Sequence, residues 1–360
     1  MPHPQICHEP DLGESPVHES SDGQARTRKW EAAGRRVLRR CMDLMILSVV
    51  VLPFVTTLAA QQRQVTSSVP AAELVARGTE LIRKGHKNDG LALLVEARGL
   101  YEDPPLDLEL TVARTHLELA YYDAAIDEAW RFLERTDDPS LRAEAYSLFG
   151  QAVLWRLLDS TAPMDTKTEL KPAEEAFVNA IGLSRGARNE ARYWLARVLH
   201  MTGRNQGAST LLEDYWREGS TRETATGAER LQRCVTTLLQ GGVLEELPPG
   251  GHPPRVVSAR PFVEYTEMAD LGFVVGKVVT RVLIGRDGKA SCIQVVEKDF
   301  GSSSHGWGLT RQALATIGEW EYEPASIDGE PVPAYLDVVV EFSMARRGRA
   351  AESRGRYVKN

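Results

Sequence analysis

The side chains that could do chemistry are few, and they form no complete catalytic or metal-binding pattern. The chain has four cysteines, Cys7, Cys41, Cys234 and Cys292. They make no CxxC pair and no close cluster, so a disulfide scaffold and a structural zinc site are both disfavoured. Gly272, Gly276 and Lys277 resemble a phosphate-binding loop, but the spacing is one residue short and the following Ser or Thr is missing.

Acidic and histidine residues give no stronger signal for catalysis. Glu319, Glu321 and Glu323 alternate along a strand-like segment, as on a solvated face. His305 follows Ser302–Ser304 in a polar loop. The chain contains neither a Gly-x-Ser-x-Gly nor a His-Glu-x-x-His motif. We therefore expect a protein that is not an enzyme, with no metal and no cofactor.

Length and composition indicate what kind of protein must position any site. The 360 residues suggest two to three domains, and 42% hydrophobic with 26% charged residues is ordinary for a globular protein. The net charge of -7 argues against a nucleic-acid partner. Residues 1–41 are polar and then basic, which predicts a disordered cytoplasmic leader.

Residues 42–60 are mostly apolar and just long enough to cross a bilayer. The preceding positive charge places the N-terminus in the cytoplasm. A signal anchor would hold the protein in the inner membrane with a periplasmic C-terminal part. The small residues of Thr57–Ala60 also suit a cleaved signal peptide and a periplasmic protein. A buried core helix is the third interpretation.

Residues 70–240 predict a helical repeat array. Small residues recur in the middle of one apolar helix and early in the next: Gly78, Gly90, Ala113, Ala125, Gly150, Ala176, Ala196 and Ala208. Small residues allow two helices to approach closely, the principle of a helix-turn-helix repeat of about 34 residues. A polar loop over residues 159–171 interrupts the third unit, and residues 221–240 predict a final capping helix. The pattern resembles degenerate tetratricopeptide (TPR) repeats. Such a solenoid leaves a face free for an unknown protein partner.

A linker rich in Gly and Pro over residues 241–254 leads to a different kind of sequence at 255–346. Alternating strands flank the Asp287-Gly288 turn, an apolar helical stripe follows, and a last strand begins at Ala334. This predicts a small α+β domain with a helix on a three-stranded antiparallel sheet. Residues 347–360 predict a disordered tail.

The spaced motifs of this domain resemble the C-terminal domain of TonB energy transducers. The shared residues are Gly276, Asp287, Gly288, Trp320, Tyr322, Pro324, Asp328 and Gly329. Upstream, Tyr265, Glu267 and Ala269 stand where the family has Tyr-Pro-x-x-Ala, with Thr266 in place of the proline.

The resemblance implies a periplasmic protein in energy transduction for transmembrane transport. Its partner would be an outer-membrane TonB-dependent receptor, whose TonB box segment adds as a strand to the domain's edge. The corresponding edge comprises Tyr335, Leu336, Asp337, Val338, Val339, Val340, Glu341 and Phe342. The stretch at Tyr265 would lie beside it.

Two departures from the family leave an alternative open. The segment 42–60 lacks the histidine with which the family engages the proton-driven ExbB/ExbD motor. A helical array also replaces the long Pro-rich spacer of the family. Packed helices span a much shorter distance than an extended spacer, but they offer a binding surface. The alternative is a non-energised periplasmic scaffold or adaptor whose TonB-like domain only mediates protein–protein interaction.

Overall fold

The computed structural model describes residues 69–162, 165–184, 190–219, 222–258, 263–347 and 350–358. The predicted leader, 1–41, and membrane segment, 42–60, lie outside these ranges. No helix in the described ranges combines the length and hydrophobicity that a membrane crossing requires.

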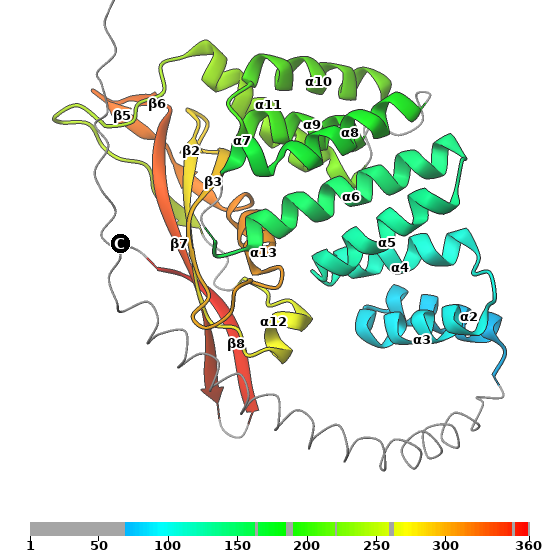
Figure 1. Ribbon diagram of the computed structural model, residues 1–360. Helices are drawn as coiled ribbons and strands as arrows, with labels where there is room; N and C mark the ends of the chain where they lie inside the picture. The colour runs from blue at the N-terminus through cyan, green and yellow to red at the C-terminus, as the bar shows by residue number, and fades with distance from the viewer. Residues whose placement is uncertain are drawn as a thin grey trace, which may run out of the picture. The chain divides into compact units, whose positions relative to one another are not determined.

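Helices fill the first part, as predicted. They are α2 (Ala71–Arg83), α3 (Lys87–Leu100), α4 (Leu106–Glu118), α5 (Tyr122–Arg135), α6 (Pro139–Asp159), α7 (Thr166–Glu169), α8 (Lys171–Leu183), α9 (Glu190–Met201), α10 (Asn205–Glu218) and α11 (Arg222–Gln240). They pack in successive pairs, α2 with α3, α4 with α5, α6 with α8 and α9 with α10 (Figure 1). We call α2 to α11 the helical array.

The small residues that predicted the repeats lie where paired helices touch. A Cβ added at Gly90 would lie 2.6 Å from the carbonyl oxygen of Gly78. A Cβ at Gly150 would lie 2.7 Å from the ring of Phe177 on α8. Both distances are shorter than atoms tolerate, so these pairs need a residue without a side chain. The contact between α6 and α8 thereby gains a fully buried aromatic ring.

The last helix closes the array as the sequence predicts. On α11, Leu231 and Val235 are buried with Tyr215 of α10 in one cluster. Leu238 packs instead toward the following domain, against Cys292 and Leu283.

The second part is an α+β domain, which we call the sheet domain. Its strands are β1 (Arg255–Ser258), β2 (Gly276–Ile284), β3 (Ala290–Asp299), β4 (Glu321–Glu323), β5 (Ala325–Ile327), β6 (Glu330–Val332), β7 (Ala334–Arg347) and β8 (Ala350–Val358), and its helices are α12 (Glu267–Leu271) and α13 (Leu309–Ile317). The main sheet has the order β3-β2-β7-β8, with antiparallel neighbours. Leu309, Ala313 and Ile317 of α13 pack on it against Val278 and Val340.

The sheet differs from the predicted one in its strand number. We expected three strands and a disordered tail over residues 347–360, but Ala350–Val358 forms β8, which makes the main sheet four-stranded. This segment has few apolar side chains, so its sequence favoured disorder. A ladder is made by backbone N–H and C=O groups, which every such residue carries.

The linker also has partners in the sheet domain. The Leu244 N–H donates to the carbonyl of Pro333 at 3.1 Å, and His252 exchanges two backbone hydrogen bonds with Ser326. Residues 241–254 therefore follow the surface of the sheet domain.

Candidate functional site

Strand β7 carries all eight residues of the predicted receptor-binding edge. One side of the strand pairs with β2 along its whole first part, from Ala334 opposite Ile284 to Phe342 opposite Gly276. The N–H and C=O groups on that side are therefore used inside the sheet. Only the opposite side of β7 is available to another strand.

Part of that opposite side is already paired. Strand β8 runs antiparallel to β7 from Val339 opposite Val358 to Arg347 opposite Ala350. The predicted edge is thus divided: Val339, Val340, Glu341 and Phe342 lie between two strands, which corrects the expectation of a free edge there. Tyr335, Leu336, Asp337 and Val338 precede the ladder with β8 and border β2 alone in the main sheet. The linker reaches the start of this stretch, where Leu244 forms an isolated bridge with Ala334.

The side chains of β7 divide by face as the alternation predicts. Val338, Val340 and Phe342 are buried in the core under α13, and Leu336 packs at its border. On the other face, the Asp337 carboxylate accepts a hydrogen bond from the Arg281 side chain at 3.2 Å. The guanidinium of Arg281 also lies 6.0 Å from the ring of Tyr335. The core face fixes the strand. The other face is mixed, because the buried Val339 lies on it together with Tyr335 and Asp337.

The upstream motif lies against the core face of β7. The Tyr265 ring meets Phe342 edge to face, with centroids 5.5 Å apart. Glu267 begins α12, and Ala269 is fully buried. Thr266, which replaces the family's proline, accepts a hydrogen bond from the Ala269 N–H at 3.2 Å and donates to the carbonyl of Trp307 at 2.5 Å. The substituted threonine therefore caps α12 and ties it to the loop before α13.

The shared family residues are structural. A Cβ at Gly288 would lie 2.4 Å from the carbonyl oxygen of Tyr322, and its φ is +71°, so this turn requires glycine. The Tyr322 hydroxyl donates to the carbonyl of Ile317 at 2.8 Å, and Trp320 is buried in the same core. Asp328 and Gly329 both have positive φ, as the turn between β5 and β6 demands.

The remaining shared positions also belong to turns and strand ends. A Cβ at Gly276 would lie closer to the carbonyl oxygen of Asp299 than any atom can approach, where β2 meets β3. The Asp287 side chain accepts a hydrogen bond from the Lys289 N–H at 3.1 Å, and Pro324 separates β4 from β5. These residues shape the domain that presents β7.

A second site, which the sequence did not predict, lies where the helical array meets the sheet domain. Asp159, at the end of α6, is fully buried. Its Oδ2 accepts a hydrogen bond from the Gly308 N–H at 2.6 Å, and its Oδ1 accepts one from the Thr310 N–H at 3.2 Å. Burial raises the pKa of Asp159, and the hydrogen bond from Gly308 opposes that rise. The carboxyl group of one domain thus caps α13 of the other, although we had expected residue 159 to open a polar loop.

The sheet domain caps the array in return. The Lys298 ammonium donates to the carbonyls of Leu157 and Leu158 at 3.2 and 3.0 Å. Arg311 donates to the carbonyl of Glu118 at 2.7 Å. These carbonyls lie at the C-terminal ends of α6 and α4, where helices leave acceptors unpaired and favour positive charge. Backbone groups at the helix ends of each domain therefore form hydrogen bonds with side chains of the other domain.

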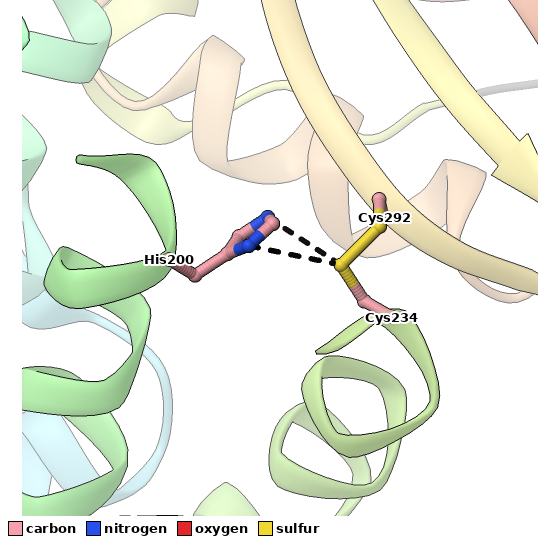
Figure 2. Close-up of side chains that lie close together, drawn as sticks. All are labelled: His200, Cys234 and Cys292. Atoms are coloured by element: carbon pink, nitrogen blue, oxygen red, sulfur yellow. Dashed lines mark hydrogen bonds between the residues drawn. A yellow bond between two sulfur atoms is a disulfide. The ribbon is translucent and has the colours of Figure 1, made fainter. Parts of the chain in front are cut away.

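A disulfide joins the same two domains. Cys234 of α11 is bonded to Cys292 of β3, across a sequence separation of 58 residues (Figure 2). The sequence disfavoured a disulfide framework because the cysteines are far apart along the chain. One bond is not such a framework, but the sequence did not predict this pair, because only the packing of α11 on β3 brings the two sulfurs together.

His200 of α9 points at the disulfide (Figure 2). Its Nε2 lies 3.4 Å from the Cys234 sulfur, and its Nδ1 lies 2.8 Å from the Asn205 side-chain oxygen. Burial lowers the pKa of His200, so the neutral ring is favoured. His200, Cys234 and Cys292 together have the residue types of a zinc site, but zinc requires thiolate sulfurs. The bonded pair offers none, so this group is a cross-link beside a histidine.

Two features could have indicated this junction in the sequence. Asp159 stands at the end of an apolar helix, and Lys298 ends an alternating strand. Each is typical of a helix or strand end, and nothing in the spacing says that one residue meets the other domain. The pairing depends on tertiary packing.

Comparison with known proteins identifies one of the two domains. Residues 262–344 match the family described as Gram-negative bacterial TonB protein C-terminal, which confirms the resemblance found from the motifs. A thermophilic TPR protein from Thermus thermophilus is similar in structure, with 18% identity and a TM-score of 0.39 over 47% of this chain and 84% of that one. MamA from Desulfovibrio magneticus is similar with 15% identity and a TM-score of 0.34 over 53% of this chain and 93% of that one. No curated protein sequence matches significantly.

Proposed function

We propose that this protein, whose residues 262–344 form a TonB C-terminal domain, binds a strand of outer-membrane TonB-dependent receptors on the outer side of β7. The observation that carries the proposal is the partly free edge of the sheet. Tyr335 to Val338 pair with β2 on one side and precede the ladder with β8 on the other. A strand that adds there would use main-chain hydrogen bonds for affinity and Tyr335 and Asp337 for selectivity.

The helical array is proposed to hold a protein partner. Paired helices form an extended surface, which solenoid proteins use for binding. Trp130 is 53% exposed on α5, and Val178 is 52% exposed on α8, so large apolar side chains remain on this surface. The proposal gives the protein an adaptor role and no catalytic one.

An envelope location outside the cytoplasm is part of the proposal. The disulfide between Cys234 and Cys292 supports it, because such bonds persist in the periplasm and are rare in the cytosol. The apolar segment 42–60 would serve as a signal anchor in the inner membrane, or as a signal peptide removed on export.

Cross-linking in the native cell envelope tests the edge. A photoreactive amino acid at Asp337 lies on the proposed binding side, and one at Val296, which is 57% exposed on the opposite edge strand β3, is the matched control. We expect adducts with TonB-dependent receptors from position 337 and none from position 296. Absence of receptor adducts at 337, or equal yields at both positions, would contradict the proposal.

The second candidate function is a scaffold without energy coupling. It is favoured by the hydrogen bonds and disulfide that fix the sheet domain to the array, since an energy transducer of this family uses a long extended spacer. Purification of the full chain from membranes separates the two. Recovery of ExbB/ExbD-type motor subunits, with a transport phenotype that a protonophore abolishes, would support energy coupling. Recovery of receptors without a motor, and a phenotype indifferent to the protonophore, would support the scaffold.

A further inference from the structure

A cavity of about 580 Å³ lies between the helical array and the sheet domain. Residues from α6, α9 and α11 form one side, and residues from β3 and α13 form the other. His200 and the disulfide, which Figure 2 shows, are among the residues that line it. Its volume falls within the range of about 300 to 1,000 Å³ that small-molecule sites occupy. We call it the interdomain cavity.

Aromatic side chains give the cavity flat apolar walls. The rings of Trp155 and Trp194 meet edge to face with centroids 6.1 Å apart, and Tyr193 lies 4.9 Å from Trp194. Leu314 of α13 and Ile293 of β3 line the opposite side. Walls of this kind accept the face of a planar or aliphatic group.

Three arginines line the same cavity, Arg197, Arg230 and Arg311. None of them lies within salt-bridge distance of a carboxylate in the described part of the chain. Glu319 is the single acid among the lining residues, and burial lowers the pKa of His200, which leaves that ring neutral. The cavity therefore carries an excess of positive charge.

The arginines are held differently. The Arg197 guanidinium carbon lies 4.7 Å from the centre of the Trp155 ring and 5.7 Å from that of Trp194. Arg311 uses its hydrogen bonds on the carbonyls at the end of α4. Arg197 and Arg230 are left with donors for a ligand.

Arg230 shows most clearly that a partner is missing. No described residue forms a hydrogen bond with its guanidinium, and its buried Nε has no acceptor. Its guanidinium lies against the backbone of Gly318, where no side chain could fit. Burial lowers the pKa of Arg230, the nearby charges of Arg233 and Arg197 act in the same direction, and Tyr193 and Glu319 oppose them. Glu319 makes no salt bridge with Arg230, so it offsets the cost of burying this charge only in part, and an anion bound to the guanidinium would lower that cost further.

We propose that the interdomain cavity binds a small organic anion. Its carboxylate or phosphate is held by Arg197 and Arg230, and its flat apolar body lies against Trp194 and Leu314. A guanidinium fork matches either headgroup with two parallel hydrogen bonds. The ligand touches both domains, so it joins the array to the sheet domain without occupying the β7 edge.

Isothermal titration calorimetry on the purified full chain tests the site. The probes are 2-naphthoate, 2-naphthyl phosphate and the neutral 2-naphthamide, which share one flat body and differ in the headgroup. We expect saturable binding of one molecule of at least one anion, and at least tenfold weaker binding of the amide. The stronger of the two anions identifies the headgroup. Absence of saturable binding of either anion up to 1 mM, or equal affinity for the amide, would overturn the proposal.

Arginine variants connect the binding to the cavity. R197Q and R230Q are each expected to weaken anion binding at least tenfold while leaving the affinity for the amide unchanged. R204Q is the control, because Arg204 lies outside the cavity and pairs with Glu174 on the array surface. Circular dichroism checks that each variant is folded, and R230K replaces R230Q if the latter unfolds. Full anion affinity in both R197Q and the folded Arg230 variant would overturn the assignment.

Discussion

His200 shows how a single buried ring makes stability depend on pH. Burial lowers the pKa of His200 in the folded protein, while in the unfolded chain the ring binds a proton near pH 6.5. Below that pH the unfolded state binds more protons, so the free energy of unfolding falls as the pH falls. This stabilising contribution is complete above about pH 7 and is lost toward pH 5.

The variant H200N tests this dependence, because asparagine does not titrate and can still donate a hydrogen bond to Asn205. Between pH 7.5 and pH 5 the native chain is expected to lose up to about 2 kcal/mol more than H200N. Urea denaturation at both pH values measures the difference. Parallel losses in the two proteins would show that the ring is not responsible.

The helix cap that Asp159 makes between the domains can be tested against the cap that Asp138 makes within the array. Asp159 uses both carboxylate oxygens, one for Gly308 and one for Thr310. Asp138, the cap of α6, accepts both of its hydrogen bonds on Oδ1. An asparagine keeps one acceptor oxygen and places an NH₂ group where the second would be.

We therefore expect D159N to lower the free energy of unfolding by about 1 to 3 kcal/mol, and D138N by less than about 0.5 kcal/mol. Chemical denaturation of both variants measures this. Equal losses would mean that the second oxygen of Asp159 has no structural role.

At the scale of the elements, the contact between α6 and α8 depends on a missing side chain. In G150A the new methyl group would meet the Phe177 ring, with an expected loss of about 1 to 3 kcal/mol. Gly182 on α8 has open space around it, so G182A is expected to be neutral or to stabilise by up to about 1 kcal/mol. Thermal unfolding of the two variants compares them, and a stabilised G150A would contradict the close approach.

Strand β8 and a receptor strand would compete for one side of β7. Removal of residues 348–360 exposes the backbone groups that nine register positions, Val339 to Arg347, now share with β8. We expect a receptor-derived peptide to bind the truncated chain at least severalfold more tightly than the full chain. Fluorescence anisotropy with a labelled TonB box peptide measures this, and a scrambled peptide is the control. Unchanged or weaker binding would place the peptide elsewhere or on Tyr335–Val338 alone.

The elements differ in how far the sequence predicts them. The helix pairs could be predicted from small residues such as Gly90 and Gly150, because a small residue in an apolar helix marks the place where a second helix can approach closely. The hairpin at Asp287-Gly288 follows from its turn chemistry. Strand β8 was missed because its pairing uses backbone groups that every residue has. The division of the predicted edge could not be seen for the same reason.

At the scale of the whole molecule, the disulfide and the reciprocal caps make one body of two domains. Residues 69 to 360 form a single compact unit. Neither the cysteine pair nor the partners of Asp159 could be predicted, since the residues involved are 58 and about 150 positions apart. Contacts at such separations leave no periodic signal in a single sequence.

Removal of the disulfide is expected to lower the free energy of unfolding by about 4 kcal/mol, from the loop of 58 residues that it closes. The double variant C234S/C292S measures this by chemical denaturation. C7S/C41S, whose cysteines lie outside the described residues, controls for cysteine removal. If dithiothreitol destabilises C234S/C292S as much as the native chain, the bond between these two residues is not the cause.

The cross-link between α11 and β3 also sets how the chain responds to tension. A pull along the chain passes from Cys234 to Cys292 through the sulfur bond, so the linker and β2 between them carry no load. At about 3.5 Å per residue, the segment between the two cysteines would have an extended length of some 200 Å. This length cannot be pulled out until the bond is reduced. The oxidised protein therefore transmits force over a short path. Only after the bond is reduced can a pull unfold the segment between the two cysteines and add that length.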